Sequence, residues 1–391
     1  MAKAPVQVPP GRVWLNPDEP DDDYPMFATT AVPPKKPGTV RVWVDGCFDM
    51  LHFGHANAIR QARALGHELF VGSHSDEEVI RYKGPPIMTA DERYEALRAC
   101  KWVDFVVENY PYCTRLKDIE RFEVDFVVHG DDISTDLSGR NSYQDIIDAG
   151  RFKVVKRTEG ISTTDLVGRM LLCTKGHFKG EEVDSPLIKD AKDPSTNLRY
   201  LTTSRKIAQF SNQRTPSPDD KIVYVDGAFD LFHIAHMRIL EAARKFGTFV
   251  IVGIHEDAVV NEHKGSNYPI MNLNERVLGV LSCRWVDEVV MGVPFHVSEE
   301  LMKSLNVDVV VAGGIYEEVA GDVGRDPYAV PRKLGKLQVV KNDCKLTTGD
   351  IIDRVIKARE AFVARQAAKL VKDKKVEEAK PEEFRNVREV A

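Results

Sequence analysis

Apolar and polar positions follow two alternating spacings along the chain. Short runs of apolar, often β-branched residues are separated by stretches whose apolar positions recur at helical spacing. Strands are predicted at residues 40–44, 68–73, 105–107, 125–129, 222–225, 249–254, 289–291 and 307–312. Helices are predicted at residues 55–65 and 91–99. Strands that alternate with such helices indicate an α/β fold with a doubly wound parallel sheet, and nearly continuous apolar strands indicate that both of its faces are covered.

The sequence also repeats itself. VDGCFDMLHFGH at residues 44–55 recurs as VDGAFDLFHIAH at residues 225–236, an offset of 181 residues. Lys83-Gly84 recurs at the same offset, and Thr163-Thr164 matches Thr347-Thr348 at an offset of 184 residues. So small a drift in the offset means that one fold occurs twice, with short loop insertions. We therefore expect two tandem Rossmann-like domains, at residues 40–174 and 221–365.

The segments outside the two repeats have a different composition. Residues 1–39 hold nine of the 21 prolines and an acidic cluster, so we expect a disordered N-terminus. Residues 175–220 read as a linker in which residues 201–210 have the spacing of a short helix. Residues 366–391 are rich in Lys, Glu and Ala and read as a charged tail, a solvated helix that frays.

Composition narrows the class of protein. There are 54 Lys and Arg residues against 60 Asp and Glu, a net charge of −6, which argues against a nucleic-acid binder. Apolar runs such as residues 249–254 are far shorter than the roughly 18 residues needed for a transmembrane segment. We expect no secretory signal, because no basic segment followed by an apolar one opens the sequence. Six cysteines without CxxC spacing suggest free thiols in the reducing cytoplasm.

Candidate chemistry follows the first strand of each repeat. In an open parallel sheet, ligands bind beyond the carboxyl ends of the strands. His52 and His55 stand there, and Gly54 between them would let a ligand approach the backbone closely. A helix that starts at His55 would add free amide groups and a dipole that favour an anion. Two histidines buried in a core, or a zinc-binding pair, are the alternatives. The recurrence of the motif with its flanking residues favours a phosphate site.

These residues carry a resemblance to a known family. DGCFDMLHFGH, KGPPIM and RTEGISTTDLVGRML resemble motifs of the cytidylyltransferase family of nucleotidyltransferases, and the resemblance covers roughly residues 40–365. The HxGH motif also occurs in class I aminoacyl-tRNA synthetases, but no KMSKS-like loop is found. The tandem arrangement is similar to the branch of the family that acts on phosphoethanolamine.

The resemblance implies a reaction. The cytidylyl group of CTP would pass to phosphoethanolamine by direct in-line attack, giving CDP-ethanolamine and pyrophosphate in phosphatidylethanolamine biosynthesis. Phosphocholine or glycerol 3-phosphate as the acceptor, and a non-catalytic nucleotide-binding regulatory protein, are the alternatives. Mg²⁺ is expected with CTP, bound through its phosphates, without metal ligands from the protein. Beyond these small molecules, no nucleic-acid partner is expected, and a homo-oligomer is left open.

The resemblance also implies roles for individual residues. The catalytic residues would be His52, His55, Lys83 and Arg157. The CTP-binding residues would be Gly46, Cys47, Phe48, His129, Gly130, Ser162, Thr163 and Thr164. Taken alone, Lys83 could be a solvated surface residue and Arg157 could pair with a structural carboxylate.

The second repeat keeps only part of this pattern. A second nucleotide site there would use Gly227, Ala228, Phe229, His233, His236, Lys264, Gly314, Thr347 and Thr348. HxGH has become His-Ile-Ala-His, Lys341 aligns with Arg157, and Gly313 aligns with His129. We therefore expect this domain to be partly degenerate, with nucleotide binding or support of the first domain as its remaining role.

Overall fold

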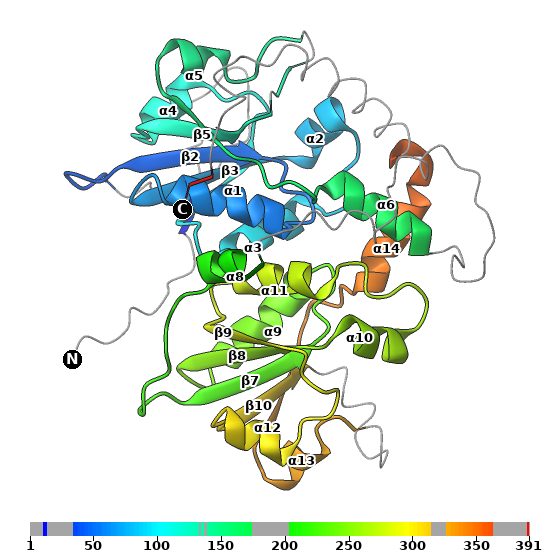
Figure 1. Cartoon of the computed structure of the whole chain (residues 1–391). Coiled ribbons are helices and arrows are strands. Elements are labelled where there is room, and N and C mark those ends of the chain that lie inside the picture. Colours follow the sequence, from blue (N-terminus) through cyan, green and yellow to red (C-terminus); the bar gives the residue numbers. More distant parts are fainter. Residues whose placement is uncertain are drawn as a thin grey trace. The chain divides into compact units, whose positions relative to one another are not determined.

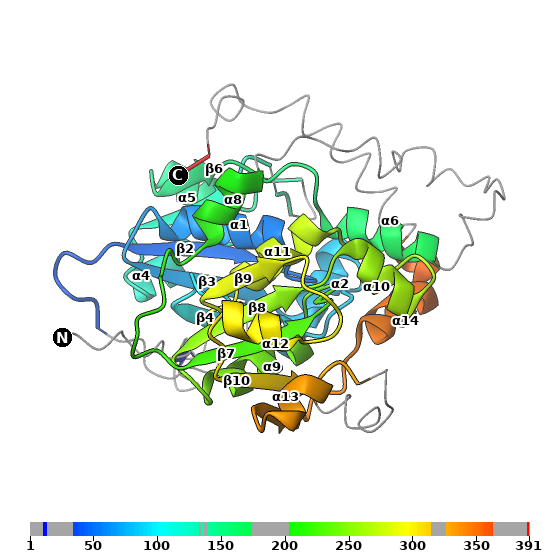
Figure 2. The same cartoon turned by 60° about the horizontal axis from the view of Figure 1, so that its bottom comes forward.

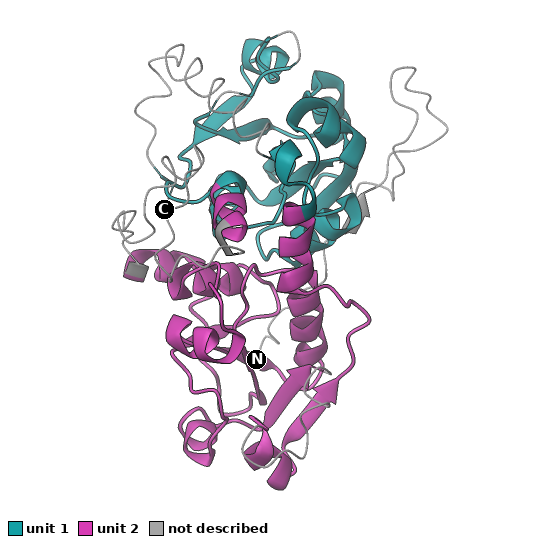
Figure 3. Ribbon diagram, turned by 90° about the vertical axis from the view of Figure 1, so that its right-hand side faces the viewer, with its two compact units in different colours: residues 1–164, 357–391 teal, residues 165–356 magenta. Residues whose placement is uncertain are grey.

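The structure, a computed structural model, describes residues 11–13, 34–132, 134–136, 139–173, 203–313, 326–362 and 389–390. The chain forms two compact units (Figure 3). Unit 1 comprises residues 1–164 and 357–391, and unit 2 comprises residues 165–356. Each unit contains one of the two sheets.

Unit 1 is built on a six-stranded sheet whose strands all pair in parallel. Its strands are β1 (Gly11–Val13), β2 (Arg41–Gly46), β3 (Glu68–His74), β4 (Phe105–Tyr110), β5 (Phe126–Gly130) and β6 (Phe152–Val155). The strand order is β1-β4-β3-β2-β5-β6. From β2 the chain winds outward to β4 and then returns to add β5 and β6 on the other side. The carboxyl ends of β2 and β5 therefore flank the switch point at which ligands bind in doubly wound sheets.

Helices cover both faces of this sheet (Figure 1). They are α1 (Phe53–Arg63), α2 (Asp76–Lys83), α3 (Ala90–Ala99), α4 (Leu116–Arg121) and α5 (Gln144–Asp148). Ile119 of α4 and Ile146 of α5 pack on Trp43 and Phe70 in a cluster of buried residues, while α1 and α3 lie on the opposite face. This two-sided burial explains why the strands read as continuous apolar runs.

Unit 2 repeats the topology. Its strands are β7 (Ile222–Gly227), β8 (Phe249–Ile254), β9 (Glu288–Met291), β10 (Val309–Gly313) and β11 (Leu337–Val340), in the order β11-β10-β7-β8-β9. Its helices are α8 (Thr203–Phe210), α9 (Ile234–Arg244), α10 (Asp257–Lys264), α11 (Leu273–Leu281), α12 (Glu299–Ser304), α13 (Ala329–Lys333) and α14 (Thr348–Lys357), whose last residue belongs to unit 1 (Figure 2). Helix α6 (Thr163–Cys173) begins in unit 1 and continues in unit 2.

Matching helix starts show how closely the two copies correspond. Thr89 caps α3: its Oγ1 accepts a hydrogen bond from the backbone N–H of Glu92, whose carboxylate accepts one from the backbone N–H of Thr89. Asn272 and Glu275 form the same capping box at α11. Each reciprocal pair satisfies two backbone donors that a helix start otherwise leaves without partners.

The predicted α/β class is confirmed in both units, and the predicted helix at residues 201–210 is confirmed as α8. Within residues 1–39, which we predict to be disordered, Gly11–Val13 form strand β1, which pairs in parallel with β4. Most of the predicted linker and tail lies outside the described residues, at 174–202 and 363–388. No helix within the described ranges is long and apolar enough to cross a membrane.

Candidate active site

Helix α1 begins just beyond the end of β2, and two histidines mark its start. His52 is the N-cap residue, and its Nδ1 accepts hydrogen bonds from the backbone N–H groups of Gly54 at 3.2 Å and His55 at 3.4 Å. The rings of His52 and His55 stack with their centroids 3.9 Å apart. Two imidazoles thus lie together at a helix start, where the dipole favours an anion. The helix begins at Phe53 rather than His55, and the amide groups of Gly54 and His55, which we expected to be free, are bonded to His52.

Gly54 has a role that differs from the expected ligand approach. A Cβ atom at this position would lie 2.7 Å from Cγ2 of Ile161 and 3.0 Å from the ring of His52. Real contacts are almost never that short, so the loop that carries Ile161 packs on α1 only because residue 54 is glycine. The glycine therefore joins the histidine motif to the Arg157–Thr164 motif, far away in the sequence.

The predicted nucleotide-binding residues Gly46, Cys47 and Phe48 form the turn between β2 and α1. Phe48 adopts a left-handed φ of 52°, and its ring meets that of His55 edge-on at 5.7 Å. Cys47 is buried, and its carbonyl oxygen accepts a hydrogen bond from Arg93 Nη1 at 2.8 Å. Because Ala228 replaces Cys47 in the second copy, we interpret the thiol as a packing group.

The loop after β6 carries Arg157, and two aspartates after β5 hold it. The buried side chain of Asp131 accepts hydrogen bonds from the backbone N–H of Arg157 at 3.0 Å and from Lys156 Nζ at 3.2 Å. Asp132 Oδ2 lies 3.2 Å from Arg157 Nη1. The Arg157 side chain remains 43% exposed, so its guanidinium is accessible to an anion at the switch point.

We call the loops that follow the carboxyl ends of the strands the rim of the site. A buried carboxylate lies beneath this rim, at the end of β2. Asp45 accepts hydrogen bonds from Thr114 Oγ1 at 2.7 Å and from Tyr143 Oη at 3.2 Å. Burial raises the pKa of Asp45 to about 6, although the Thr114 hydrogen bond and the charges of His129 and Lys83 oppose the shift. The His129 ring contacts Tyr143, with 4.7 Å between centroids. His129 and Lys83 therefore act on the same carboxylate, although they come from different elements.

Lys83 is the exposed last residue of α2. Its Nζ lies 5.4 Å from the centroid of the Tyr112 ring, which stacks on Tyr82 at 4.2 Å. Burial and, next, the charge of Lys83 lower the pKa of His74 to about 3. The cation thus projects toward the carboxyl ends of β2 and β3, as a phosphate-binding residue must.

The three hydroxyl residues Ser162, Thr163 and Thr164 stand at the start of α6. Thr163 Oγ1 donates a hydrogen bond to the backbone carbonyl of Asp49 at 3.2 Å. This bond attaches the start of α6 to the turn that precedes His52. Ser162 and Thr164 are its sequence neighbours, and their contact with CTP stays a prediction.

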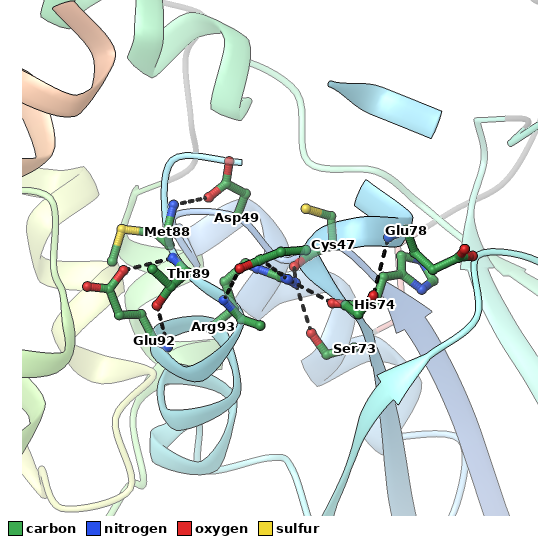
Figure 4. A network of polar contacts seen from close by, with 12 residues as sticks. Cys47, Asp49, Ser73, His74, Glu78, Met88, Thr89, Glu92 and Arg93 are labelled. Atoms are coloured by element: carbon green, nitrogen blue, oxygen red, sulfur yellow. Dashed lines mark hydrogen bonds and ion pairs between the residues drawn. The ribbon is translucent and has the colours of Figure 1, made fainter. Parts of the chain in front are cut away.

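A polar frame that the sequence analysis missed fixes these loops (Figure 4). The fully buried Arg93 donates to the carbonyls of Cys47 and His74 and to the carboxylate of Asp76. Asp49 accepts from the backbone N–H groups of Ile87 and Met88, each at 2.9 Å. The sequence repeat could have revealed this frame, because Arg93 and Asp49 recur in the second copy as Arg276 and Asp230.

The second copy keeps this frame. Asp230 accepts from the backbone N–H groups of Ile270 at 2.8 Å and Met271 at 3.0 Å. Arg276 donates to the carbonyls of Ala228 and His255. Thr348 Oγ1 donates to the carbonyl of Asp230 at 3.1 Å. Thr348 is therefore the counterpart of Thr163, so the predicted match of Thr163 to Thr347 is wrong by one residue.

The histidines of the second copy are arranged differently. The rings of His233 and His236 lie 3.9 Å apart, but here Nδ1 of His236 accepts from the backbone N–H of His233 at 3.3 Å. Burial lowers the pKa of His236 well below its ordinary value, so this ring is neutral. The ring also packs on Phe229 at 5.3 Å. Lys264 ends α10 as Lys83 ends α2, with Nζ 5.5 Å from the Tyr268 ring.

Strand pairing corrects two further matches between the copies. Gly130 pairs with Val155, and Gly313 pairs with Val340. The residue after β6 is Lys156, so its counterpart is Lys341, and Arg157 corresponds to Asn342 rather than Lys341. His129 likewise corresponds to Ala312 rather than Gly313. The proposed Gly314 lies outside the described residues. The rim of the second site has thus lost more charge than the sequence alignment indicated.

Comparisons with known proteins agree with this geometry. A family model described as cytidylyltransferase-like matches the chain twice, at residues 43–190 and 224–375. The ethanolamine-phosphate cytidylyltransferase of Dictyostelium discoideum is 51% identical over 87% of this chain and 96% of its own length. That of Mus musculus is 43% identical over 88% and 94%. Choline-phosphate cytidylyltransferase A of Mus musculus is also 43% identical, but over 34% of this chain and 36% of its own. The chain belongs to the cytidylyltransferase-like family, with one family region in each half.

Proposed function

We infer that this chain transfers the cytidylyl group of CTP to phosphoethanolamine, giving CDP-ethanolamine and pyrophosphate. One observation carries the choice of acceptor. The two relatives named for ethanolamine phosphate that are described above match 87–88% of the chain, and so both copies, whereas the relative named for choline phosphate matches 34% of it. The first copy also retains the histidine pair, Lys83 and Arg157 around one switch point.

The geometry supports a direct displacement. A phosphate oxygen of phosphoethanolamine forms a bond to the α-phosphorus of CTP while the bond from that phosphorus to the bridging oxygen breaks, and pyrophosphate leaves. His52 and His55 would bind the phosphates at the start of α1. Lys83 and Arg157 would neutralise the negative charge of these phosphates, from either side of the start of α1. Catalysis then consists of positioning and electrostatic stabilisation, without a covalent enzyme intermediate.

We propose that Mg²⁺ enters with CTP. No group of three or more His, Cys, Asp or Glu side chains in the described part of the chain could hold a metal ion. The side chains at the rim are mainly cations that suit phosphate, so the triphosphate itself would supply the oxygen ligands that Mg²⁺ prefers. When bound, the ion would add to the charge neutralisation that Lys83 and Arg157 provide.

Asp45 suits the head group. It is a buried carboxylate at the switch point, and burial, which disfavours its charged form, raises its pKa even beside the charges of His129 and Lys83. The ammonium of phosphoethanolamine would supply a positive charge and three N–H donors. A choline head group presents methyl groups instead and would leave such acceptors without hydrogen bonds, a mismatch that discriminates strongly.

The test is pyrophosphate release from CTP with phosphoethanolamine, phosphocholine and glycerol 3-phosphate measured in parallel. We expect kcat/KM with phosphoethanolamine to exceed the others by orders of magnitude. An equal or higher value with either competitor would overturn the choice of acceptor. If no pyrophosphate is released from CTP with any of the three acceptors, the result would instead favour a non-catalytic nucleotide-binding protein.

We also propose a cytoplasmic location for the protein. Cys47, Cys100, Cys113, Cys283 and Cys344 are all free thiols, which suits a reducing compartment. Fractionation of cells that express the tagged full chain would test the proposal, and recovery in a secreted or organellar fraction would contradict it.

A further inference from the structure

Two residues near the end of the sequence, Glu389 and Val390, lie against helix α1 in unit 1. Glu389 Oε1 accepts hydrogen bonds from Asn57 Nδ2 at 3.0 Å and from Arg60 Nη2 at 3.1 Å. The carbonyl of Val390 accepts from Arg60 Nη2 at 2.8 Å, and its N–H donates to Gln61 Oε1 at 3.0 Å. Four hydrogen bonds therefore join this pair to one face of α1.

The same face of α1 holds the loop that carries Arg157. Asn57 Nδ2 donates to Thr158 Oγ1 at 2.9 Å, and Gln61 Nε2 donates to the carbonyl of Lys156 at 2.8 Å. The residues on each side of Arg157 are thus fixed by two α1 side chains that Glu389 and Val390 also contact.

Burial makes this arrangement energetically significant. Asn57 is 1% exposed, Gln61 is fully buried and Arg60 is 6% exposed. Buried polar groups need hydrogen-bond partners, and a buried guanidinium needs a charged one. Glu389 uses one of the two N–H groups of Asn57 while Thr158 uses the other. Without Glu389, one N–H group of Asn57 would lose this acceptor, and the guanidinium of Arg60 would keep Asn57 Oδ1 and the Val390 carbonyl but lose this carboxylate, at the expense of their present orientation.

The second copy lacks these three side chains. The positions on α9 that correspond to Asn57, Arg60 and Gln61 are Arg238, Glu241 and Ala242. Its loop is fixed instead by a hydrogen bond from Asn342 Nδ2 to the carbonyl of Ala235 at 2.8 Å. The polar face of α1 is therefore special to the copy that retains the full catalytic motif and is not a requirement of the fold.

We propose that Glu389 and Val390 are positioning residues for the active site of unit 1. They orient Asn57 and Gln61, which in turn hold residues 156–158 so that Arg157 faces the triphosphate of CTP. The inference deepens the proposed function and rests on it for its kinetic readout.

The test replaces Glu389 and follows both the loop and the kinetics. Glu389→Ala should speed hydrogen exchange at the amides of residues 156–161 and raise the KM for CTP roughly three- to tenfold, the effect of losing about one ordinary hydrogen bond in the positioning of Arg157. The KM for phosphoethanolamine should stay within about twofold. Glu389→Gln keeps the Oε1 acceptor and should recover most of the CTP affinity. Val390→Ala keeps both backbone hydrogen bonds and serves as the matched control.

A double-mutant cycle separates positioning from general support. With Thr158→Val, the link from Asn57 to the loop is already lost, so adding Glu389→Ala should change the KM for CTP little further. Additive effects would overturn the proposal, as would unchanged loop exchange in Glu389→Ala. A lowered Tm with kcat and both KM values altered alike would show a merely structural contact. If the wild-type chain releases no pyrophosphate, the proposed function fails, whereas loop exchange still decides this inference.

Discussion

At the scale of single residues, buried polar side chains do much of the organising in this protein. Arg93 donates hydrogen bonds to backbone carbonyls at the ends of β2 and β3, and Asp49 accepts hydrogen bonds from the loop before α3. These loops are thus fixed by side chains other than the proposed catalytic residues. Such side chains are expensive to bury unless each group is paired. Lys83 is the opposite case, because it is exposed and its proposed role is to neutralise the negative charge of bound phosphates.

Replacing Lys83 tests that interpretation. Lys83→Ala removes a cation that would face the phosphates, and loss of one well-placed electrostatic group typically costs about 10²–10³ in rate. We expect kcat/KM to fall by that factor with an unchanged Tm, because an exposed lysine adds little to stability. Arg81→Ala, on the same helix with the same charge, is the control and should be nearly silent. A near-wild-type Lys83→Ala enzyme would place Lys83 on the solvated surface.

The buried carboxylate of Asp45 predicts a pH-dependent stability. Its pKa is about 6 in the folded chain against an ordinary value of 3.8, so the native state binds this proton more tightly than the unfolded state. The stability that this provides is fully present below about pH 4 and is lost as the pH rises through about 6. Two pKa units correspond to about 3 kcal/mol of unfolding free energy.

Asp45→Asn removes this titration while keeping the shape. We expect its unfolding free energy, relative to wild type, to rise by about 3 kcal/mol between pH 4 and pH 7 and then to level off. Urea unfolding of both proteins across that range measures the difference, in which the titration of all other groups largely cancels. A difference that does not change with pH would contradict the raised pKa.

At the scale of elements, each strand that periodicity predicted is present in the structure. Periodicity could not predict which contacts the side chains in the loops between the strands make. Strands β1, β6 and β11 were missed. Strand β1 has only three residues, and Lys153 and Gln338 interrupt the short apolar runs of β6 and β11. The residue matches after these strands were also misplaced, since only the pairing of Gly130 with Val155 and of Gly313 with Val340 fixes the alignment. Contacts such as Asp45 with Tyr143 span 98 positions and leave no local pattern.

The contact between α1 and the loop at Ile161 can be tested by overpacking. Gly54→Ala puts a methyl group 2.7 Å from Ile161 Cγ2. We expect a loss of about 1–3 kcal/mol in stability, the usual cost of overpacking, together with a lower kcat. Ile161→Ala should relieve the clash and restore part of both in the double mutant. Ala235→Gly at the matching position of α9 is the control, and full activity of Gly54→Ala would disprove the close contact.

At the scale of the whole molecule, the two copies share a scaffold but differ at the rim. His129 and Arg157 stand where the second copy has Ala312 and Asn342. Sequence alone indicated this asymmetry, but it could not show that the buried frame of Asp230 and Arg276 survives intact. The second unit therefore keeps its shape while its rim departs from the catalytic pattern.

Histidine substitutions in each copy should separate these roles. His52→Ala or His55→Ala should nearly abolish turnover, because both rings lie at the start of α1 where the phosphates bind. His233→Ala or His236→Ala should chiefly weaken CTP binding or stability. The test is to measure kcat, the affinity for CTP by titration, and Tm for both sets of mutants. If folded second-copy mutants lose kcat as completely as first-copy mutants, the asymmetric assignment fails.

The packing of Glu389 and Val390 on α1 also sets an order of events during synthesis. Unit 1 includes residues 357–391, so unit 2 is translated in full before unit 1 can close. At about 5–20 residues per second, the loop at residues 156–158 waits roughly 10–45 s for its last partners to emerge from the ribosome. We expect nascent chains stalled before residue 389 to be cleaved by protease near this loop, and equal protection in stalled and released chains would contradict that. The enzyme would then gain its active geometry only after residues 389 and 390 have been translated.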